Sequence, residues 1–145
     1  MVSVKYSVVI ALPLEEVFAF AADFANDEQW SATVKLSRQV SPEPLGLGTL
    51  VQQITEFMGN RLDATGEVTE FEPLARACYR AASGPVPHQD RRLFESVEGG
   101  TRLTVVIEAE LSGAYRFAEP IIRGAGQRQL EADLASLKRL LEARP

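Results

Sequence analysis

The sequence predicts an α+β fold in which a seven-stranded, curved antiparallel sheet wraps around one long C-terminal helix. Residues 115–144 are the longest helix-like stretch, and their leucines recur at steps of four, three and four residues. This spacing marks one stripe of an α-helix; the stripe consists of Leu130, Leu134, Leu137 and Leu141. Upstream, six strand-like segments follow one another with short turns, and such turns join antiparallel neighbours. A further strand-like segment and two short helices precede them.

The first strand is expected over residues 3–11, where every second residue is apolar. The alternation places one set of residues on the inner face: Val4, Tyr6, Val8, Ile10 and Leu12. Pro13 ends this strand, because proline cannot donate to a ladder. A short helix over residues 14–22 follows, with acidic residues in its first turn. Asp23 can cap a second short helix that ends near Trp30.

Turn signals separate the remaining strands. Residues 41–48 contain two prolines and two glycines, which predict a long turn, and Gly99-Gly100 predicts the tightest hairpin. The six strands are expected over residues 33–40, 49–57, 62–71, 75–82, 88–97 and 101–111. A sheet of seven antiparallel strands twists and curls. Its apolar face needs a cover, and the C-terminal helix is the one element long enough to supply it.

Length and charge limit the classes of protein that fit. The 145 residues suit one domain, residues 1–145, with a single core. The net charge of −5 and the absence of a concentrated basic face argue against a nucleic-acid partner and against binding at a membrane surface. No apolar stretch has the length of a transmembrane helix, so we expect no membrane insertion. A single cysteine, Cys78, allows no internal disulfide and suits a cytoplasmic protein.

Signatures of cofactor chemistry are missing from the sequence. There is no Gly-rich phosphate loop, no Gly-x-Ser-x-Gly and no pair of histidines. Gly124 and Gly126 lack the third glycine of a dinucleotide fingerprint, and Cys78 and His88 alone cannot build a zinc site. We therefore expect no cofactor and no metal, which leaves acid–base catalysis or simple binding.

Three segments carry a family resemblance: VVIALPLEEVFAFAADFANDEQW, FESVEGGTRLTVVIE and LEADLASLKRLLEA. With the order of elements, they resemble the helix-grip fold of the START/Bet v 1-like (SRPBCC) superfamily. More narrowly, they resemble its polyketide cyclase/dehydrase and lipid-transport-like proteins. The resemblance implies a hydrophobic cavity between the sheet and the last helix, suited to a lipid-like or aromatic guest. Members of the superfamily differ in activity, so the resemblance alone assigns no reaction.

Aromatic residues are the first candidates for the cavity wall. Tyr6, Tyr79 and Tyr115 could each present a phenol inward, which could donate to a carbonyl and stabilise an enolate. Trp30 could stack on a ring-bearing guest. For each of the four residues, the alternative is a purely structural place in the core.

Ionisable residues are the second group of candidates. Arg92 shares a strand face with Phe94, and an arginine in an apolar pocket needs a carboxylate or an anionic ligand as its counter-charge. Glu56 and Glu70 are the carboxylates that strand faces could bring to it, unless a bulge turns them to solvent. His88 is the one histidine and could act as an acid or base at the cavity mouth, or be a solvated residue beside a loop.

The first half of the C-terminal helix is irregular in sequence. Pro120, Gly124 and Gly126 indicate either a boundary between a short helix and the main one, or small residues that make room for a guest. In the second case Ile121 and Ile122 would line the cavity.

These observations leave three functions open. The first is a carrier or sensor that binds a small hydrophobic, lipid-like or polyketide-like molecule. The second is a polyketide cyclase or dehydratase with Tyr, Arg or His as proton handlers. The third is an interaction module whose vestigial cavity is filled by bulky side chains, namely Phe57, Tyr79, Phe94 and Phe117. A homodimer could form through a sheet edge or face. The expected ligand-binding residues are Tyr6, Trp30, Tyr79, Arg92, Phe94, Tyr115 and Ile122.

Overall fold

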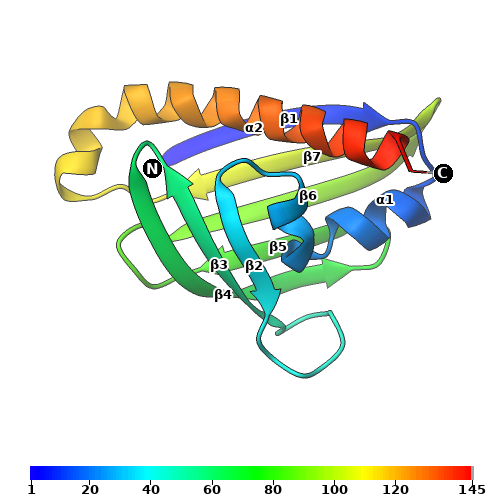
Figure 1. Cartoon of the computed structure of the whole chain (residues 1–145), viewed down its shortest axis with the longest axis horizontal. Helices are drawn as coiled ribbons and strands as arrows, with labels where there is room; N and C mark the ends of the chain where they lie inside the picture. Colours follow the sequence, from blue (N-terminus) through cyan, green and yellow to red (C-terminus); the bar gives the residue numbers. More distant parts are fainter. Residues whose placement is uncertain (145) are drawn as a thin grey trace.

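The computed structural model describes residues 1–144 and has the predicted order of elements (Figure 1). These are the strands β1 (Val2–Ile10), β2 (Val34–Gln39), β3 (Leu50–Phe57), β4 (Asn60–Glu72), β5 (Arg76–Ala81), β6 (His88–Val97) and β7 (Gly100–Ala109), the α-helices α1 (Leu14–Ala21) and α2 (Glu119–Glu142), and the 3-10 helices η1 (Phe24–Gln29) and η2 (Gly113–Ala118). The seven strands form one antiparallel sheet in the order β1-β7-β6-β5-β4-β3-β2. The predicted α+β helix-grip architecture is confirmed.

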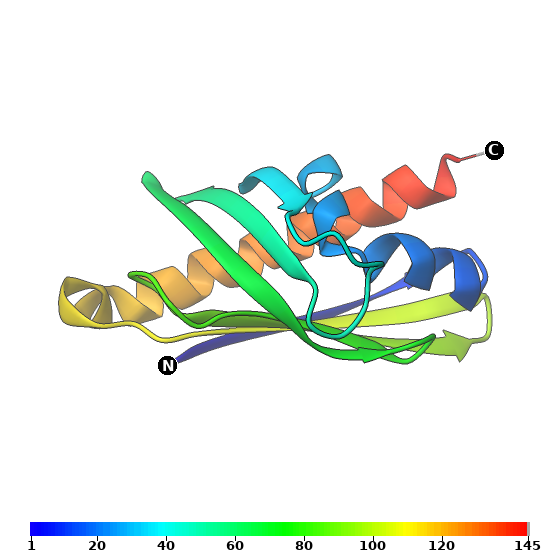
Figure 2. The same ribbon diagram turned by 90° about the horizontal axis from the view of Figure 1, so that it is seen from below.

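The sheet bends so that α2 runs along β1 while β2, β3 and β4 rise on the other side of the molecule (Figures 1 and 2). The helices α1 and η1 lie between the end of β1 and the start of β2. As predicted, the Gly99-Gly100 pair makes the hairpin between β6 and β7. Gly100 has a φ of 146°, and a Cβ atom there would collide with the Ile10 carbonyl oxygen. Only glycine lets the two chains approach this closely.

The leucine stripe of α2 faces the core as predicted. Leu130, Leu134, Leu137 and Leu141 are all buried, together with the apolar residues of α1 and of the central strands. Burial of a leucine side chain stabilises a protein by about 2 kcal/mol, so this stripe is a main reason why α2 stays on the sheet.

Polar side chains of α2 also cover the free edge of β1. The Gln127 side-chain amide bonds both the backbone N–H and the carbonyl of Lys5. Lys138 Nζ donates to the Val9 carbonyl, and Glu142 accepts from the backbone N–H just beyond the strand. An edge strand whose backbone groups are occupied is a poor template for another strand.

The opposite edge, at β2, is covered in a similar way. The backbone N–H of Ser37 donates to the Glu28 side chain, and the backbone N–H of Glu28 donates back to the Ser37 hydroxyl. Side chains therefore occupy backbone groups at both sheet edges, which makes a homodimer built by joining edges unfavourable.

Two sequence predictions need correction in this frame. The long helix begins at Glu119, with Pro120 in its first turn, and residues 113–118 form the separate short helix η2. This is the boundary that Pro120 had suggested as one alternative. Tyr6, expected inside, is 38% exposed. It lies beside buried Val105 in the sheet, but β1 is an edge strand with a neighbouring strand on one side only.

No helix within residues 1–144 is long and apolar enough to span a membrane.

The glycines give a first test of the packing. A Cβ atom at Gly66 would lie 2.5 Å from the Tyr79 ring, whereas one at Gly124 would meet only the Arg128 side chain, at 3.5 Å. We expect Gly66→Ala to lower the free energy of unfolding by about 2 kcal/mol through overpacking. Gly124→Ala should raise it by up to about 1 kcal/mol, because alanine favours helix. Urea denaturation of both variants checks this, and equal effects would contradict the packing described.

Candidate functional site

The most deeply buried charged group is the guanidinium of Arg92 on β6, which is 1% exposed. Nη1 donates to Asp27 Oδ1 at 2.9 Å, and Nη2 donates to Asp27 Oδ2 at 2.9 Å. Nε and Nη2 donate to the two carboxylate oxygens of Asp90 at 3.1 and 2.8 Å. The fifth bond, from Nη1, goes to the Ala21 carbonyl at 2.9 Å. A guanidinium has five N–H donors, so every donor of Arg92 is used.

Aromatic rings and an amide complete this Arg92 cluster, which we define as Arg92, Asp27 and Asp90. The guanidinium carbon lies 4.2 Å from the ring centre of Phe24 and 5.2 Å from that of Trp30, within cation–π range. Gln53 Nε2 donates to Asp27 at 2.9 Å. Burial raises the pKa of the Asp27 carboxyl group, and the attraction of Arg92 opposes that rise.

The Arg92 cluster joins α1 and η1, which we call the helical wedge, to the sheet, because Asp27 belongs to η1 while Arg92 and Asp90 belong to β6. The counter-charge predicted for Arg92 is thus supplied by two aspartates. Of the two alternatives for Glu56 and Glu70, the structure shows the second: they are partly exposed and form ion pairs with Arg61 and Arg91 instead of Arg92. Because the guanidinium has no free donor, the expectation that Arg92 binds a ligand is not supported by this geometry.

Three more of the expected ligand-binding residues are core residues. Tyr79 is 1% exposed, and its hydroxyl donates to the Val51 carbonyl at 2.9 Å. Phe94 packs edge-on against Phe18, with ring centres 4.9 Å apart. Trp30 is buried, and its Nε1 has no hydrogen-bond partner within residues 1–144. All three fill space between the sheet and the helices rather than line an open pocket.

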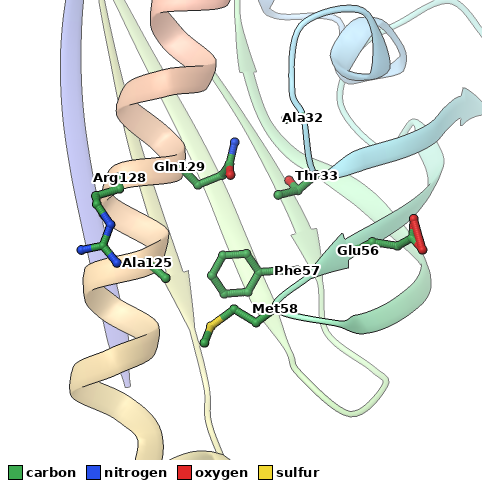
Figure 3. Close-up of a pocket in the computed structure, with 8 residues that line it drawn as sticks. All are labelled: Ala32, Thr33, Glu56, Phe57, Met58, Ala125, Arg128 and Gln129. Carbon is green, nitrogen blue, oxygen red and sulfur yellow. The ribbon is translucent and has the colours of Figure 1, made fainter.

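One hollow that could receive a molecule lies between α2, the residues just before β2 and the end of β3, and we refer to it as the α2–β3 pocket. Its volume is about 390 Å³. It is lined by Ala32, Thr33, Glu56, Phe57, Met58, Ala125, Arg128 and Gln129. Phe57 and Met58 project from the end of β3 towards Ala125 (Figure 3). Gln129 and Thr33 face one another at one end, whereas the Glu56 and Arg128 side chains point away from the group (Figure 3).

None of the seven expected ligand-binding residues is among those that line this pocket. The Tyr115 hydroxyl instead donates to Asn60 Oδ1 at 3.4 Å, and Ile122 is half-buried on α2. A second hollow of about 540 Å³ is lined by Gly113, Arg116, Phe117 and Glu119. Phe117 there is 92% exposed, so it does not fill a cavity as the vestigial-module hypothesis expected.

The sequence contained a weak signal for the residues that were missed. Ala125 and Gln129 are four residues apart on one side of α2, and Ala125 lies between Gly124 and Gly126, which make this part of the helix irregular in sequence. Of the small residues in this part of the helix, Ala125 is the one that lines the pocket. Gly126 instead lies against Val4 of β1.

His88 does not line the α2–β3 pocket. It begins β6, and its Nδ1 lies 3.0 Å from the Val86 carbonyl oxygen. Its ring centre is 6.3 Å from that of Tyr79, a buried residue. This position gives no support to a proton-transfer role at the pocket.

Removal of the Arg92 side chain tests its structural role. We expect Arg92→Met to lower the free energy of unfolding by about 3–5 kcal/mol, because two carboxylates lose their buried partner. Arg102→Met is the matched control on an exposed pair with Glu95, where about 1 kcal/mol or less is expected. Denaturant unfolding measures both. A cost for Arg92→Met no larger than that of the control would contradict the role.

The buried phenol of Tyr79 predicts an alkaline dependence of stability. Burial raises its pKa to about 12, so the stability that it contributes is complete below its unfolded-state pKa of about 10. That contribution should be lost between pH 10 and 12, at a cost of roughly 2–3 kcal/mol. Tyr79→Phe should lack this loss, although at pH 8 it should be less stable because the bond to Val51 is missing. Parallel slopes of unfolding free energy against pH for the two proteins would exclude the effect.

Comparisons with known proteins agree with this architecture. A family profile described as "Polyketide cyclase / dehydrase and lipid transport" matches residues 1–142. No curated protein sequence matches the chain. Among solved structures, a protein from Thermus thermophilus is 20% identical with a TM-score of 0.83, and the alignment covers 97% of each chain.

Two other solved structures share the architecture. A START superfamily protein from Mycobacterium smegmatis is 17% identical with a TM-score of 0.81, over 97% of both chains. The Zhui aromatase/cyclase from a Streptomyces species is 16% identical with a TM-score of 0.76, over 98% of this chain and 94% of the other. At these identities the structures share the fold. Because the family profile spans nearly the whole sequence, the chain belongs to the polyketide cyclase/dehydrase and lipid transport family.

Proposed function

We propose that this protein binds a small hydrophobic, lipid-like or polyketide-like molecule in the α2–β3 pocket and acts as a carrier or sensor. The observation that carries the proposal is an open pocket of about 390 Å³ in which an apolar wall stands beside a polar end formed by Thr33 and Gln129. This volume lies in the range of small-molecule sites, which are hydrophobic with a few placed polar groups. Phe57 and Met58 form the apolar wall opposite Ala125 (Figure 3).

The arrangement of ionisable groups favours binding over catalysis. A general acid or base must reach the reacting atom. The two charged residues at the pocket, Glu56 and Arg128, point away from it (Figure 3). Arg92 and Tyr79 are occupied by bonds inside the core. None of these groups is placed to move a proton on a guest in the pocket.

The cyclase or dehydratase hypothesis is supported by the family description and by the fold shared with an aromatase/cyclase. The interaction-module hypothesis finds support in Tyr79 and Phe94, which fill the inner part of the space under α2. However, Phe57 lines the pocket and leaves it open.

A pair of alanine substitutions on α2 tests the proposed site. Ala125→Trp should fill the pocket and weaken binding of a naphthalene-sized probe, 2-naphthol, at least tenfold. Ala132→Trp makes the same change at an exposed position of the same helix and should leave binding unchanged. Calorimetric titration of the three proteins provides the measurement.

Native mass spectrometry of the purified protein, beside a denatured control, asks whether a guest is already present. A guest lost in Ala125→Trp and kept in Ala132→Trp would support the proposal. Equal binding by both variants would place the site elsewhere. If the wild-type protein cyclised or dehydrated a poly-β-ketone and Ala125→Trp abolished that activity, the protein would be an enzyme and the carrier proposal would be overturned.

A further inference from the structure

Thr33 and Gln129 form the polar end of the α2–β3 pocket. The buried carboxylate of Asp133 lies next to this end and fixes it through hydrogen bonds. Asp133 projects from α2 and is 6% exposed. It accepts hydrogen bonds from Ser31 Oγ at 2.7 Å, from the backbone N–H of Ala32 at 3.0 Å and from Gln129 Nε2 at 2.7 Å. A carboxylate only accepts, so each of these three groups must donate to it.

This requirement fixes the orientation of the Gln129 amide. One of the two N–H groups of its nitrogen donates to Asp133, which places the nitrogen on that side and leaves the carbonyl oxygen as a free acceptor on the other. Figure 3 shows the Gln129 nitrogen directed away from Phe57, with the side chain extended towards Thr33. An amide in the opposite orientation would place two acceptor oxygens against each other.

The same requirement fixes the hydroxyl groups. Ser31 has one hydroxyl hydrogen, and it points at Asp133. The Ser31 and Thr33 oxygens are 3.2 Å apart, so in this pair Ser31 must accept and Thr33 must donate. The hydrogen of Thr33 is thereby used, and its free lone pairs are acceptors. Both side chains that face one another at this end of the pocket therefore present acceptors.

We propose that the polar end of the pocket selects guests that carry a neutral hydrogen-bond donor, namely a phenolic or alcoholic hydroxyl group on an apolar body. A hydroxyl group can donate to Thr33 Oγ1 or to Gln129 Oε1. An ether or ketone at the same place meets these two acceptor oxygens and would have to reach the second N–H group of Gln129, on the side of the amide away from Phe57, whereas a carboxylate meets acceptors and the buried charge of Asp133. Desolvation of an ammonium group beside Phe57 and Met58 would be costly. This inference rests on the proposed function, since it concerns the same pocket.

Three matched naphthalenes test the selectivity: 2-naphthol, 2-methoxynaphthalene and 2-naphthoate. The wild-type protein should bind the naphthol about tenfold more tightly than the methyl ether, the effect of about one buried hydrogen bond. The naphthoate should bind more weakly than the naphthol. Calorimetric titration at pH 7 gives the three dissociation constants.

Variants locate the effect. Thr33→Val keeps the shape of the side chain but removes one acceptor, so the naphthol/ether ratio should fall by several-fold. Thr65→Val, at an exposed position of β4, is the matched control and should keep the wild-type ratio. Asp133→Asn introduces an amide, which can donate as well as accept. The hydrogen bonds around residue 133 then no longer have one fixed direction, so the naphthol/ether affinity ratio should fall. If Asp133→Asn does not fold, Thr33→Val alone decides.

The outcomes separate this inference from the proposed function. Equal affinities for the naphthol and the ether, both abolished by Ala125→Trp, would overturn the donor selectivity and keep the binding site. Tightest binding of the naphthoate would also overturn the selectivity. Failure of all three probes to bind would overturn both. A tenfold preference that Thr33→Val reduces and Thr65→Val retains would support both.

Discussion

The five hydrogen bonds of the buried Arg92 guanidinium are the interaction on which the rest of the structure depends. Burying a charge is costly unless its donors are satisfied, and Asp27, Asp90 and the Ala21 carbonyl satisfy them together. Because these groups come from α1, η1 and β6, the bonds fix the wedge relative to the sheet. With the wedge in place, aromatic side chains fill the space beneath it, and open volume remains on the other side, between α2 and β3.

A second buried carboxylate, Asp133, makes the corresponding connection from the C-terminal helix. Its bonds to Ser31 and Ala32 hold the segment between η1 and β2 against α2, next to the pocket. The leucine stripe supplies most of the attraction between α2 and the core, but it has little directional character. The hydrogen bonds of the Asp133 carboxylate are directional, and they orient the polar side chains that a guest would meet. Stability and the proposed ligand preference would therefore both depend on Asp133.

Much of the fold could be predicted from the sequence, because period-two alternation, turn residues and the leucine stripe are local signals. The site could not, since it depends on long-range partners. Arg92 was correctly expected to need a counter-charge, but no local pattern identifies Asp27, sixty-five residues away, as its partner. Tyr79 and Phe94 were correctly placed inside but belong to the packed core. Tyr6 follows the inward alternation, yet edge-strand position leaves it partly exposed. Ala125 and Gln129 give no chemical signal until β3 is placed opposite them.

The central claim is that the α2–β3 pocket receives a hydrophobic guest with its polar end at Thr33 and Gln129. A crystal structure of the protein soaked with 2-naphthol tests it most directly. We expect the rings between Phe57 and Ala125, with the hydroxyl oxygen within hydrogen-bond distance of Thr33 Oγ1 or Gln129 Oε1. Density for the probe at another place, such as the hollow beside Phe117, or an inverted probe with its hydroxyl group towards solvent, would contradict the account.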